Sequence, residues 1–567
     1  MSVSSATSSS SSTTSSTSST SATTDPANID WSELVSEMVA AYTAQADSIE
    51  TELTDNETKI STYQQMQTLL SSLESAAQVL ADPSNPSTSS NNVFLARSAT
   101  LTSSGDVSAS AVLGVTLDNG AATGSHTLTV SQLAEAEKVG SATAASDTTA
   151  LGYSGVFSLA AADGTAVDIS IDSSMSLTDV VNAINDETET TGVQASIVEV
   201  SSSEYELVMT TSTTNQAITA SSVSGDDVLS DLGITDSSGN FTNMLQTAQA
   251  AVFTLDGIEI TRDTNDISDV LNGVSFDLYS TTPSGTSITM DVGVDTDAIE
   301  TALESLVDAY NSYRDFAIEQ EATDSTTGTA LSTAILFGDG TLRDVNEELA
   351  DALNTTVGGV SMSSLGLSFN SSDELELDSS TLESTLGSDL AGVESLLGFS
   401  ATTSSSDLSV VLHGSDAPSD FTLDLTVDGS GNLISASVDG DSSLFTIEGS
   451  EIIGNSGTAY AGFTFSFSGT TSESVDVSLS YGIASLLYNA ADQASDTTTG
   501  TVQTIISGLE DTDTTLQNRI DDIDSAAEIY QSELTARYAE YEEQISEAET
   551  TQQYLTALLD SSSSSSS

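Results

Sequence analysis

Very few residues of this sequence could carry out acid–base or nucleophilic chemistry. Its two histidines, His126 and His413, fall in separate stretches that alternate like β-strands, where a lone histidine is usually a surface or core residue. The two lysines, Lys59 and Lys138, are too few for a phosphate-handling site. The sequence also lacks the Gly-x-Ser-x-Gly elbow, the Gly-x-x-x-x-Gly-Lys-Ser/Thr loop and the His-Glu-x-x-His helix. We therefore predict no enzymatic activity, no catalytic residue and no cofactor.

Calcium is the one metal for which the sequence offers candidate ligands. Residues 428–432, Asp-Gly-Ser-Gly-Asn, begin like an EF-hand loop, but Leu433 stands where that loop requires glycine. A second acidic group, Asp291, Asp295 and Asp297, gathers at the end of a predicted strand. A hairpin turn and an acidic loop are the simpler interpretations, so no metal site is predicted.

The charge composition excludes several classes of partner. The 567 residues include 85 acidic and 8 basic side chains, for a formal net charge of −77. Nucleic acid and anionic lipid surfaces bind Lys and Arg, so we expect no nucleic-acid partner and no membrane insertion. Paired carboxylates occur by chance among so many acids and therefore do not favour a glycosidase. Zero cysteines exclude disulfides, thiolate metal sites and cysteine nucleophiles.

The length of the chain is sufficient for three or four domains, each with a core of its own. Both ends have low complexity, with Ser/Thr-rich residues 1–27 and polyserine 561–567, and we predict disordered tails there. The N-terminus lacks the basic and apolar regions of a cleaved signal peptide. The sequence also contains no run of 18 apolar residues, which a membrane span would need. Export would therefore follow a route without a cleaved signal.

The sequence near the N-terminus predicts a helix of about fifty residues. Asp30 is a suitable N-cap, and Glu33 stands at the capping-box distance from it. The pattern stops at the Asp-Pro and Asn-Pro pairs that contain Pro83 and Pro86. The apolar residues at helical intervals are Trp31, Leu34, Val35, Met38, Tyr42, Ile49, Leu53, Ile60, Tyr63, Leu70, Leu73, Ala77 and Leu80.

The C-terminal end carries a matching pattern, and we expect the two ends to pair as a coiled-coil stalk. An extra four-residue step after Leu534 is a stutter, which locally underwinds a coiled coil. A long amphipathic helix that packs only on its own domain is the alternative. The seam positions are Leu516, Ile520, Ile523, Ala527, Tyr530, Leu534, Tyr538, Tyr541, Ile545, Ala548, Gln552, Leu555 and Leu559.

Between the two ends the apolar period changes to two, which is typical of strands. A short helix is predicted over Ser176–Asn185, another helix over Asp297–Gln320, and a second β-rich block over Phe421–Tyr481. We predict an α+β multidomain fold in which antiparallel β-rich head domains are inserted between paired terminal helices. The predicted domains are a tail (1–27), N-terminal leg and coiled-coil helices (28–90), a first β domain (91–125 and 245–295), an inserted β domain (126–244), a helical domain (296–400), an extra β block (401–481), C-terminal coiled-coil and leg helices (482–560) and a tail (561–567).

Several ordered segments resemble the flagellar filament-capping family, also called hook-associated protein 2. The most specific match runs from Phe253-Thr254-Leu255-Asp256-Gly257 to Leu271-Asn272-Gly273-Val274. This match includes residues 264–267, and the other matching segments are residues 28–39, 127–134, 176–185, 191–198, 309–311, 364–367 and 375–378. Each match is weak alone, but together they keep the family's order. The Ser/Thr tail, the lack of bases and the extra β block depart from the family pattern.

The resemblance implies a structural protein outside the cell. Family members are exported through the flagellar type III apparatus without a cleaved signal. They form a ring at the filament tip, of five or six copies, with terminal helices as legs and β domains as a plate. They retain flagellin, which folds beneath the plate, and they meet the hook–filament junction proteins. Some members also adhere to host surfaces, so the resemblance implies filament growth, motility and a possible adhesive role.

Under this interpretation the apolar seams Leu34–Tyr42 and Tyr538–Leu559 contact the filament, whereas the Leu516–Leu534 half could instead serve only helix pairing. The residues expected in coiled-coil, oligomer or filament contact are Leu34, Met38, Tyr42, Ile49, Leu53, Leu516, Ile520, Ile523, Tyr530, Leu534, Tyr538, Tyr541, Ile545 and Leu555.

Two other classes of protein share parts of this composition. A secreted adhesin or cell-envelope fibre would share the Ser/Thr richness, acidity and β modules, but it would not need matched seams at both ends. A hydrolase from a saline habitat is a third class, and the sequence offers no site for it. Two solvents would suit so acidic a chain: high salt, which shortens the Debye length to about 3 Å at 1 M, or acid near the carboxyl pKa of about 4.

Overall fold

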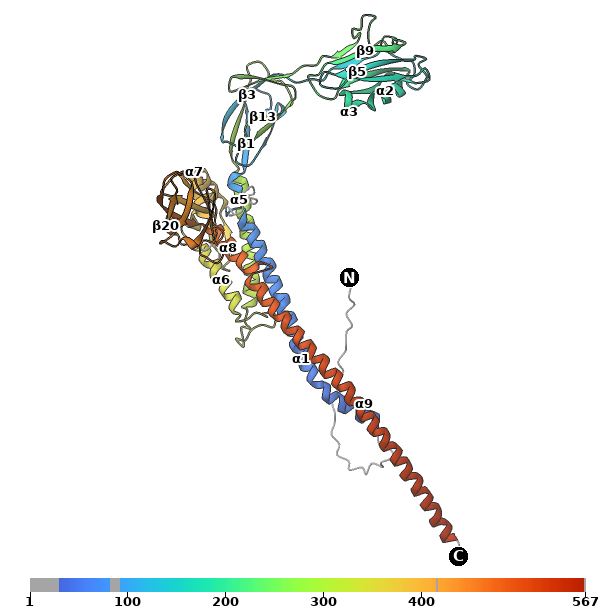
Figure 1. Cartoon of the computed structure of the whole chain (residues 1–567), viewed down its shortest axis with the longest axis vertical. Helices are drawn as coiled ribbons and strands as arrows, with labels where there is room; N and C mark the ends of the chain where they lie inside the picture. The colour runs from blue at the N-terminus through green and yellow to red at the C-terminus, as the bar shows by residue number, and fades with distance from the viewer. Residues whose placement is uncertain (1–29, 82–91, 415–416, 565–567) are drawn as a thin grey trace. The chain divides into compact units, whose positions relative to one another are not determined.

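The computed structural model describes residues 30–81, 92–414 and 417–564, which form two compact units. Of the described residues, unit 1 comprises 30–71, 315–346 and 492–564, and unit 2 comprises 72–81, 92–314, 347–414 and 417–491. Long helices at both ends and antiparallel strands between them confirm the predicted α+β multidomain fold (Figure 1). The predicted tail over 1–27, residues 565–567 and both proline stops lie outside the described residues. Among the described helices, none combines the length and the hydropathy of a membrane span.

Two long helices, α1 (Trp31–Gln78) and α9 (Thr501–Ser564), supply most of unit 1. One carboxylate oxygen of Asp30 accepts hydrogen bonds from the backbone N–H groups of Ser32 and Glu33, each at 3.1 Å. These bonds satisfy donors that the first turn leaves open, so Asp30 caps α1 as predicted. Helix α9 ends at Ser564, four residues beyond the predicted boundary at 560, because serine costs a helix only a few tenths of a kcal/mol per residue.

The rest of unit 1 comes from the end of α5 (Thr296–Gln320), the connection after it, the start of α6 (Gly340–Leu353) and the end of α8 (Ile483–Ser495). The buried Tyr63 hydroxyl donates to Oδ2 of Asp339 at 2.6 Å. Oδ1 of Asp339 accepts from the backbone N–H of Leu342 at 3.0 Å and caps α6. One aspartate thus joins α1 to the start of α6.

The first β domain of unit 2 has a five-stranded sheet in the order β1-β15-β3-β11-β12 and a three-stranded sheet in the order β13-β14-β2. Phe253 and Phe276 meet edge to face in its core, with ring centroids 5.7 Å apart. The predicted boundary at residue 126 is wrong, because β3 pairs with β11 and β15 of this domain. Alternation identifies a strand but not its partner. The strands are β1 (Arg97–Ser103), β2 (Leu113–Leu117), β3 (Gly124–Gln132), β11 (Ala251–Leu255), β12 (Ile258–Arg262), β13 (Asp266–Leu271), β14 (Val274–Leu278) and β15 (Ile288–Val294).

The inserted β domain therefore starts after β3. Its sheets have the orders β10-β4-β8-β7 and β6-β5-β9, and helix α2 packs into their shared core through Leu177, Val180 and Ile184. Ser176 and Asp179 form a reciprocal capping box at the start of α2. The elements are β4 (Lys138–Gly140), β5 (Gly155–Ala161), β6 (Val167–Ile171), α2 (Leu177–Asn185), α3 (Thr188–Thr191), β7 (Val193–Ser201), β8 (Glu204–Thr211), β9 (Ile218–Gly225), α4 (Val228–Asp231) and β10 (Met244–Gln246).

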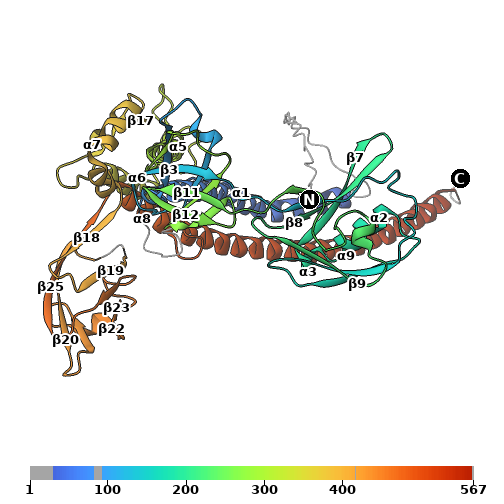
Figure 2. The ribbon, with the colours of Figure 1, turned by 90° about the horizontal axis from the view of Figure 1, so that it is seen from above.

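A helical segment and the extra β block complete unit 2. Helix α7 (Ser379–Leu397) follows the hairpin β16 (Leu367–Phe369) and β17 (Leu375–Leu377). The block begins at Phe399, earlier than the sequence pattern indicates, because β18 pairs with β25 at the far end of the block. The strands of the block, labelled β18 to β25 where there is room, are seen together in Figure 2. Its two four-stranded sheets enclose an aromatic core that includes Phe463 and Phe465. The strands are β18 (Phe399–Thr403), β19 (Leu408–Leu412), β20 (Asp420–Val427), β21 (Leu433–Ser437), β22 (Phe445–Glu448), β23 (Glu451–Gly454), β24 (Thr464–Phe467) and β25 (Glu473–Tyr481).

Candidate functional site

The described parts of α1 and α9 pair antiparallel within unit 1 (Figure 1). Near the start of α1, Trp31 stacks on Tyr538 with ring centroids 4.8 Å apart. Farther along, the amide of Asn56 donates to a carboxylate oxygen of Asp513 at 2.9 Å. Residue numbers rise along α1 as they fall along α9, which fixes the antiparallel direction. The predicted pairing of the terminal helices is confirmed.

A small apolar cluster lies at the centre of this helix pair. Its buried members come from both helices and are Ala46, Ile49, Leu516 and Ile520, with Leu53 and Ile523 half-buried against them. Full burial of one isoleucine or leucine side chain stabilises a fold by about 1.5–3 kcal/mol. Burial along the two helices extends beyond this cluster, since Val35, Ala527 and Leu534 are also buried.

Aromatic side chains extend the contact toward the start of α1. Tyr541 lies at a tilt to Trp31 with centroids 6.5 Å apart, and Tyr42 meets Tyr530 at 5.7 Å. The Tyr538 hydroxyl lies 3.5 Å from the Met38 sulfur. Aromatic pairs of this kind contribute about 0.5–1.5 kcal/mol each beyond the area that they bury. These aromatic contacts hold the N-terminal part of α1 against α9.

The predicted contact residues separate into three groups by exposure. Four are buried, namely Ile49, Leu516, Ile520 and Leu534. Seven are half-buried, namely Leu34, Met38, Leu53, Ile523, Tyr530, Tyr538 and Ile545. Three are exposed, namely Tyr42, Tyr541 and Leu555. The seam from Leu34 to Tyr42 thus lies largely against α9.

The last part of α9 differs from the paired part. All side chains described from Ser546 to Asp560 are exposed, including Tyr554 and Leu555. The aromatic contacts between the two helices reach Tyr541, which Trp31 contacts at the start of the described part of α1. Some twenty residues of α9 therefore extend past the contacts with described α1 and carry large apolar side chains on their surface.

The two paired helices carry charge of one sign. Helix α1 has 8 acidic and 1 basic side chain, and α9 has 14 and 2, so the two together carry a formal charge of −19. No ion pair joins these helices within the described ranges. A hydrogen bond between the neutral amide of Asn56 and the carboxylate of Asp513 links the two helices instead of an ion pair. The pair therefore forms against electrostatic repulsion.

Neither histidine is placed for catalysis. Nδ1 of His126 lies 2.8 Å from Oδ2 of Asp256, and this contact, with the N–H of Thr127, holds the pKa of Asp256 below its ordinary value. His413 stacks on Phe399 with ring centroids 3.7 Å apart. Each ring therefore has a structural role.

The candidate calcium ligands also make structural contacts. Oδ1 of Asp428 accepts from the backbone N–H groups of Ser430 and Asn432, which lowers its pKa and closes a turn. Asp295 caps α5 by accepting from the N–H of Ala298 at 3.1 Å. Across the described residues, no three His, Asp or Glu side chains are placed to hold a metal ion.

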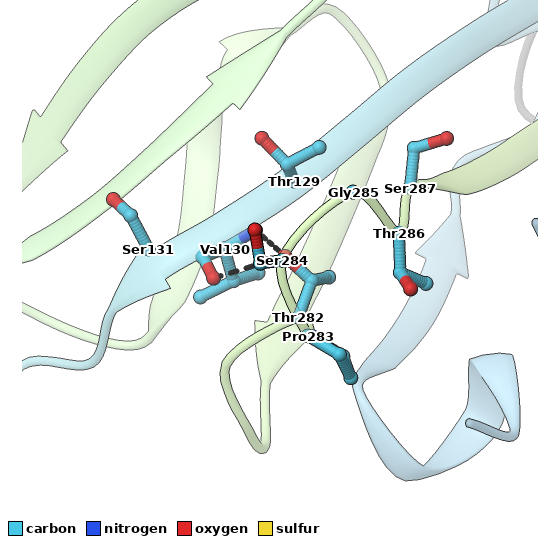
Figure 3. A pocket seen from close by; sticks show the side chains of 9 residues that line it. All are labelled: Thr129, Val130, Ser131, Thr282, Pro283, Ser284, Gly285, Thr286 and Ser287. Atoms are coloured by element: carbon cyan, nitrogen blue, oxygen red, sulfur yellow. Dashed lines mark hydrogen bonds between the residues drawn. The ribbon is translucent and has the colours of Figure 1, made fainter. Parts of the chain in front are cut away.

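The first β domain has an open hollow of about 420 Å³ beside β3 and the loop 282–287 (Figure 3). The hydroxyl of Thr282 bonds to the backbone N–H and C=O of Val130, each at 3.1 Å. The lining has serine and threonine hydroxyls but no charged or aromatic side chain. Without a titratable group or a ring for stacking, it offers no chemistry.

Sequence reasoning missed two features of the helix pair. It did not single out Asn56, although a polar residue in register with Ile49 and Leu53 is a known signal for helix register. It also did not identify which aromatic residue Trp31 contacts, since no local pattern specifies a partner about 500 residues away.

Comparisons with known proteins point to one family. A family model described as the C-terminus of flagellar hook-associated protein 2 matches residues 248–550, and the N-terminus model matches residues 27–137. The flagellin hook IN motif matches residues 156–213 of the inserted domain.

Individual proteins of this family are similar over most of their length. The chain is 27% identical over 388 residues to the B-type flagellar hook-associated protein 2 of Pseudomonas aeruginosa. It is 31% identical over 387 residues to flagellar hook-associated protein 2 of Escherichia coli K12. Each match covers 65% of this chain and 78% of the relative. A crystal structure of the D1-D2-D3 domains of the Escherichia coli flagellar cap protein FliD matches at 22% identity with a TM-score of 0.48, covering 79% of this chain and 99% of that one.

Proposed function

This chain belongs to the flagellar hook-associated protein 2 family, the structural, non-enzymatic proteins that cap the tip of the bacterial flagellar filament, and we propose that it promotes filament growth there. In this role it retains exported flagellin beneath the cap and assists the folding and polymerisation of each new subunit. Motility would depend on it, because filament elongation requires the cap.

The single observation that carries this proposal is the arrangement of α1 and α9. A cap that stays on a growing filament must release and rebind as subunits add, so its contacts must be modest and separable. The paired part of the two helices includes the small Ile49–Ile520 cluster, whereas the side chains of α9 from Ser546 to Asp560 are exposed, which suits a helix end that binds and releases a partner. We assign filament contact to the surface from Tyr541 to Leu559 and helix pairing to the segment from Leu516 to Leu534.

Further details of the proposal follow from the family. The working form is a ring of identical copies, five or six by family resemblance. Its partners are flagellin and the hook–filament junction proteins. The protein reaches the outside of the cell through the flagellar type III system without a cleaved signal. The extra β block is proposed as an addition to the plate, where it could also serve adhesion.

A truncation tests the role of the end of α9. Removal of Ala548–Ser567 deletes exposed residues only among those described, so it leaves the buried cluster and both β domains intact. We expect a folded protein that no longer caps, with unpolymerised flagellin in the medium and short or absent filaments. Circular dichroism and thermal unfolding of the purified variant check that it is folded. Filaments of normal length on cells that produce only the truncated protein would refute this role.

Deletion of the gene distinguishes the cap from the competing adhesin function. Loss of filaments, with flagellin released into the medium, supports the cap. Intact flagella with reduced attachment to surfaces would support a surface adhesin or cell-envelope fibre instead. Electron microscopy of the cells and immunoblots of the medium provide both readings.

A further inference from the structure

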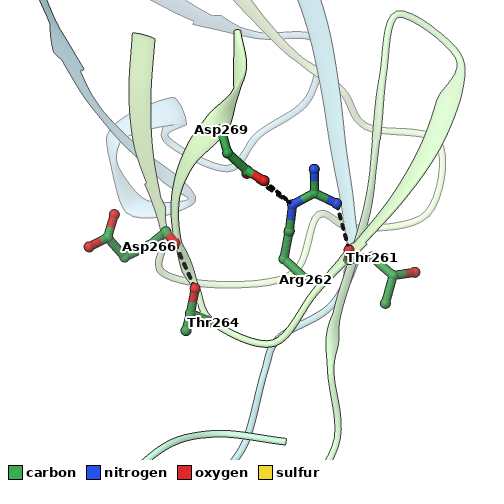
Figure 4. A network of polar contacts seen from close by, with 5 residues as sticks. All are labelled: Thr261, Arg262, Thr264, Asp266 and Asp269. Atoms are coloured by element: carbon green, nitrogen blue, oxygen red, sulfur yellow. Dashed lines mark hydrogen bonds and ion pairs between the residues drawn. The ribbon is translucent and has the colours of Figure 1, made fainter. Parts of the chain in front are cut away.

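The chain has so few basic side chains that each can be accounted for. Against 85 acidic residues there are 8 basic ones. Four of these have contacts within unit 2 or unit 1 that explain them. Arg97 donates to three backbone carbonyls, and Arg262 pairs with Asp269 at 2.9 Å (Figure 4). Arg314 lies 3.8 Å from Asp373. Arg343 donates to the carbonyls of Gly338 and Asp339. A fifth, Lys138, is half-buried on β4.

The other three, Lys59, Arg519 and Arg537, all lie on the α1–α9 pair and are exposed. In the part of the chain that the structure describes, none of them makes a hydrogen bond or an ion pair. Asp55 and Glu533 stand four residues before Lys59 and Arg537, a spacing that allows ion pairs along one helix, yet neither pair forms within 4.0 Å. These three side chains therefore have no contact of their own to explain their positive charge.

The three bases lie on one flank of the helix pair. Arg519 and Arg537 are eighteen positions apart, about five helical turns, so they project from the same face of α9 about 27 Å apart. Each stands directly before a seam residue, Ile520 or Tyr538, and Lys59 stands directly before the seam residue Ile60. This is the g position of a heptad. In an antiparallel pair the g flanks of the two helices lie on the same side.

The flank also carries acidic residues. Glu52 and Glu533 occupy other g positions, so the surface presents separated positive charges rather than a continuous basic patch. Such an arrangement fits a partner whose acidic side chains are similarly spaced.

We propose that this basic flank, defined as Lys59, Arg519 and Arg537, binds carboxylates on a second copy of this chain. The inference rests on the proposed ring. Copies with a formal charge of −77 repel one another, so neighbours in a ring need local attraction. A neighbouring copy offers many exposed carboxylates. Among the described residues, the exposed basic side chains that make no intramolecular contact lie on this flank.

The effect expected of each base is small but cumulative. Exposed ion pairs change an equilibrium constant by about two- to five-fold each, so loss of all three should weaken association about tenfold or more. Charge complementarity of this kind also speeds encounter between copies and weakens as salt rises. Apolar contacts between copies would not weaken in this way.

The test measures self-association of the full-length protein without filaments, by sedimentation at several protein concentrations. The variant K59Q/R519Q/R537Q should associate about tenfold or more weakly, whereas R519K/R537K should stay close to the parent protein. The single variant R537Q should weaken association more than K138Q, which removes the same charge from β4. Trp31 emission during urea titration reports whether the helix pair itself is unchanged.

Four results would overturn the proposal. Unchanged association of the triple variant would remove the role of the flank, and equal losses in R537Q and K138Q would assign the effect to net charge. A lower urea midpoint of Trp31 emission would show that the bases act inside their own helix pair. If only binding to flagellin weakens, the occupant is flagellin and not a second copy. Filament growth in cells is measured separately. If the protein caps filaments but does not use this flank, the proposed role of the flank is refuted and the proposed cap function is not.

Discussion

Ile520 and Ile529 offer a matched test of what holds the terminal helices together. Both are isoleucines in the middle of α9, but Ile520 is 5% exposed in the cluster with Ile49 and Leu516, whereas Ile529 is 64% exposed. Replacement of either by alanine removes the same atoms and changes intrinsic helix propensity by the same amount. The difference between the two variants therefore isolates the contact between the helices.

The size of the effect follows from burial. Isoleucine-to-alanine changes in protein cores cost about 2–5 kcal/mol. The cluster has only four buried side chains, so we expect a cost at the low end of this range, about 2 kcal/mol, for Ile520→Ala. Ile529→Ala should stay within about 0.5 kcal/mol of the parent. A difference of about 2 kcal/mol corresponds to about thirty-fold in the equilibrium between paired and separated helices.

The chain's single tryptophan provides the assay. Trp31 stacks on Tyr538 at one end of the pair, so separation of the helices exposes the indole to water and shifts its emission to longer wavelength. Urea titration followed by this emission gives the midpoint for separation in each variant. Far-UV circular dichroism on the same samples separates loss of pairing from loss of helix.

One outcome would refute this account of the pair. If Ile520→Ala and Ile529→Ala give the same midpoint, the buried cluster does not hold α1 against α9. Contacts outside the cluster, such as the stacking of Trp31 on Tyr538, would then hold the helices, and Tyr538→Ala would be the next variant to measure.

Further predictions concern salt, acid and the buried tyrosine of unit 1. Raising potassium chloride from 0.1 M to 1 M shortens the Debye length from about 10 Å to about 3 Å, so the Trp31 urea midpoint should rise; a constant midpoint would contradict the repulsion between α1 and α9. Hydrogen bonds from Ser380 and Thr381 lower the pKa of Asp378, and contacts with His126 and Thr127 lower that of Asp256. The folded protein therefore binds fewer protons at these sites than the unfolded chain, and the stability they confer is present above about pH 4 and lost as pH falls through the lowered pKa values. Thermal unfolding midpoints should thus fall as the pH is lowered from 5 to 3, and midpoints that rise on acidification would contradict this prediction. Tyr63→Phe removes the hydrogen bond to Asp339 and should cost about 1.5–3 kcal/mol in chemical unfolding, with a loss below 0.5 kcal/mol counting against that bond.

Local patterns allowed much of the fold to be predicted, and long-range pairing limited the rest. The long terminal helices and α2 were predicted because a 3.6-residue period or a capping box extends over neighbouring residues. The assignment of β3 to the first β domain was not predicted, because its pairing with β15 joins residues more than 150 positions apart. The predicted boundary of the extra β block at residue 401 lies two residues from the start of β18, but the strand itself was not identified, since it pairs with β25 about 80 residues later.

The sequence by itself determined the charge, the lack of catalytic groups and the apolar seams at both ends. Composition is fixed without folding, and a seam is a local period of three and four residues. The tertiary structure decided which part of each seam is buried, so that Ile49 meets Ile520 while the surface from Ser546 to Asp560 stays exposed. It also placed Lys59, Arg519 and Arg537 on one flank. These choices depend on the register of two helices separated by more than 400 residues of chain, and that register is set by packing contacts that no local pattern contains.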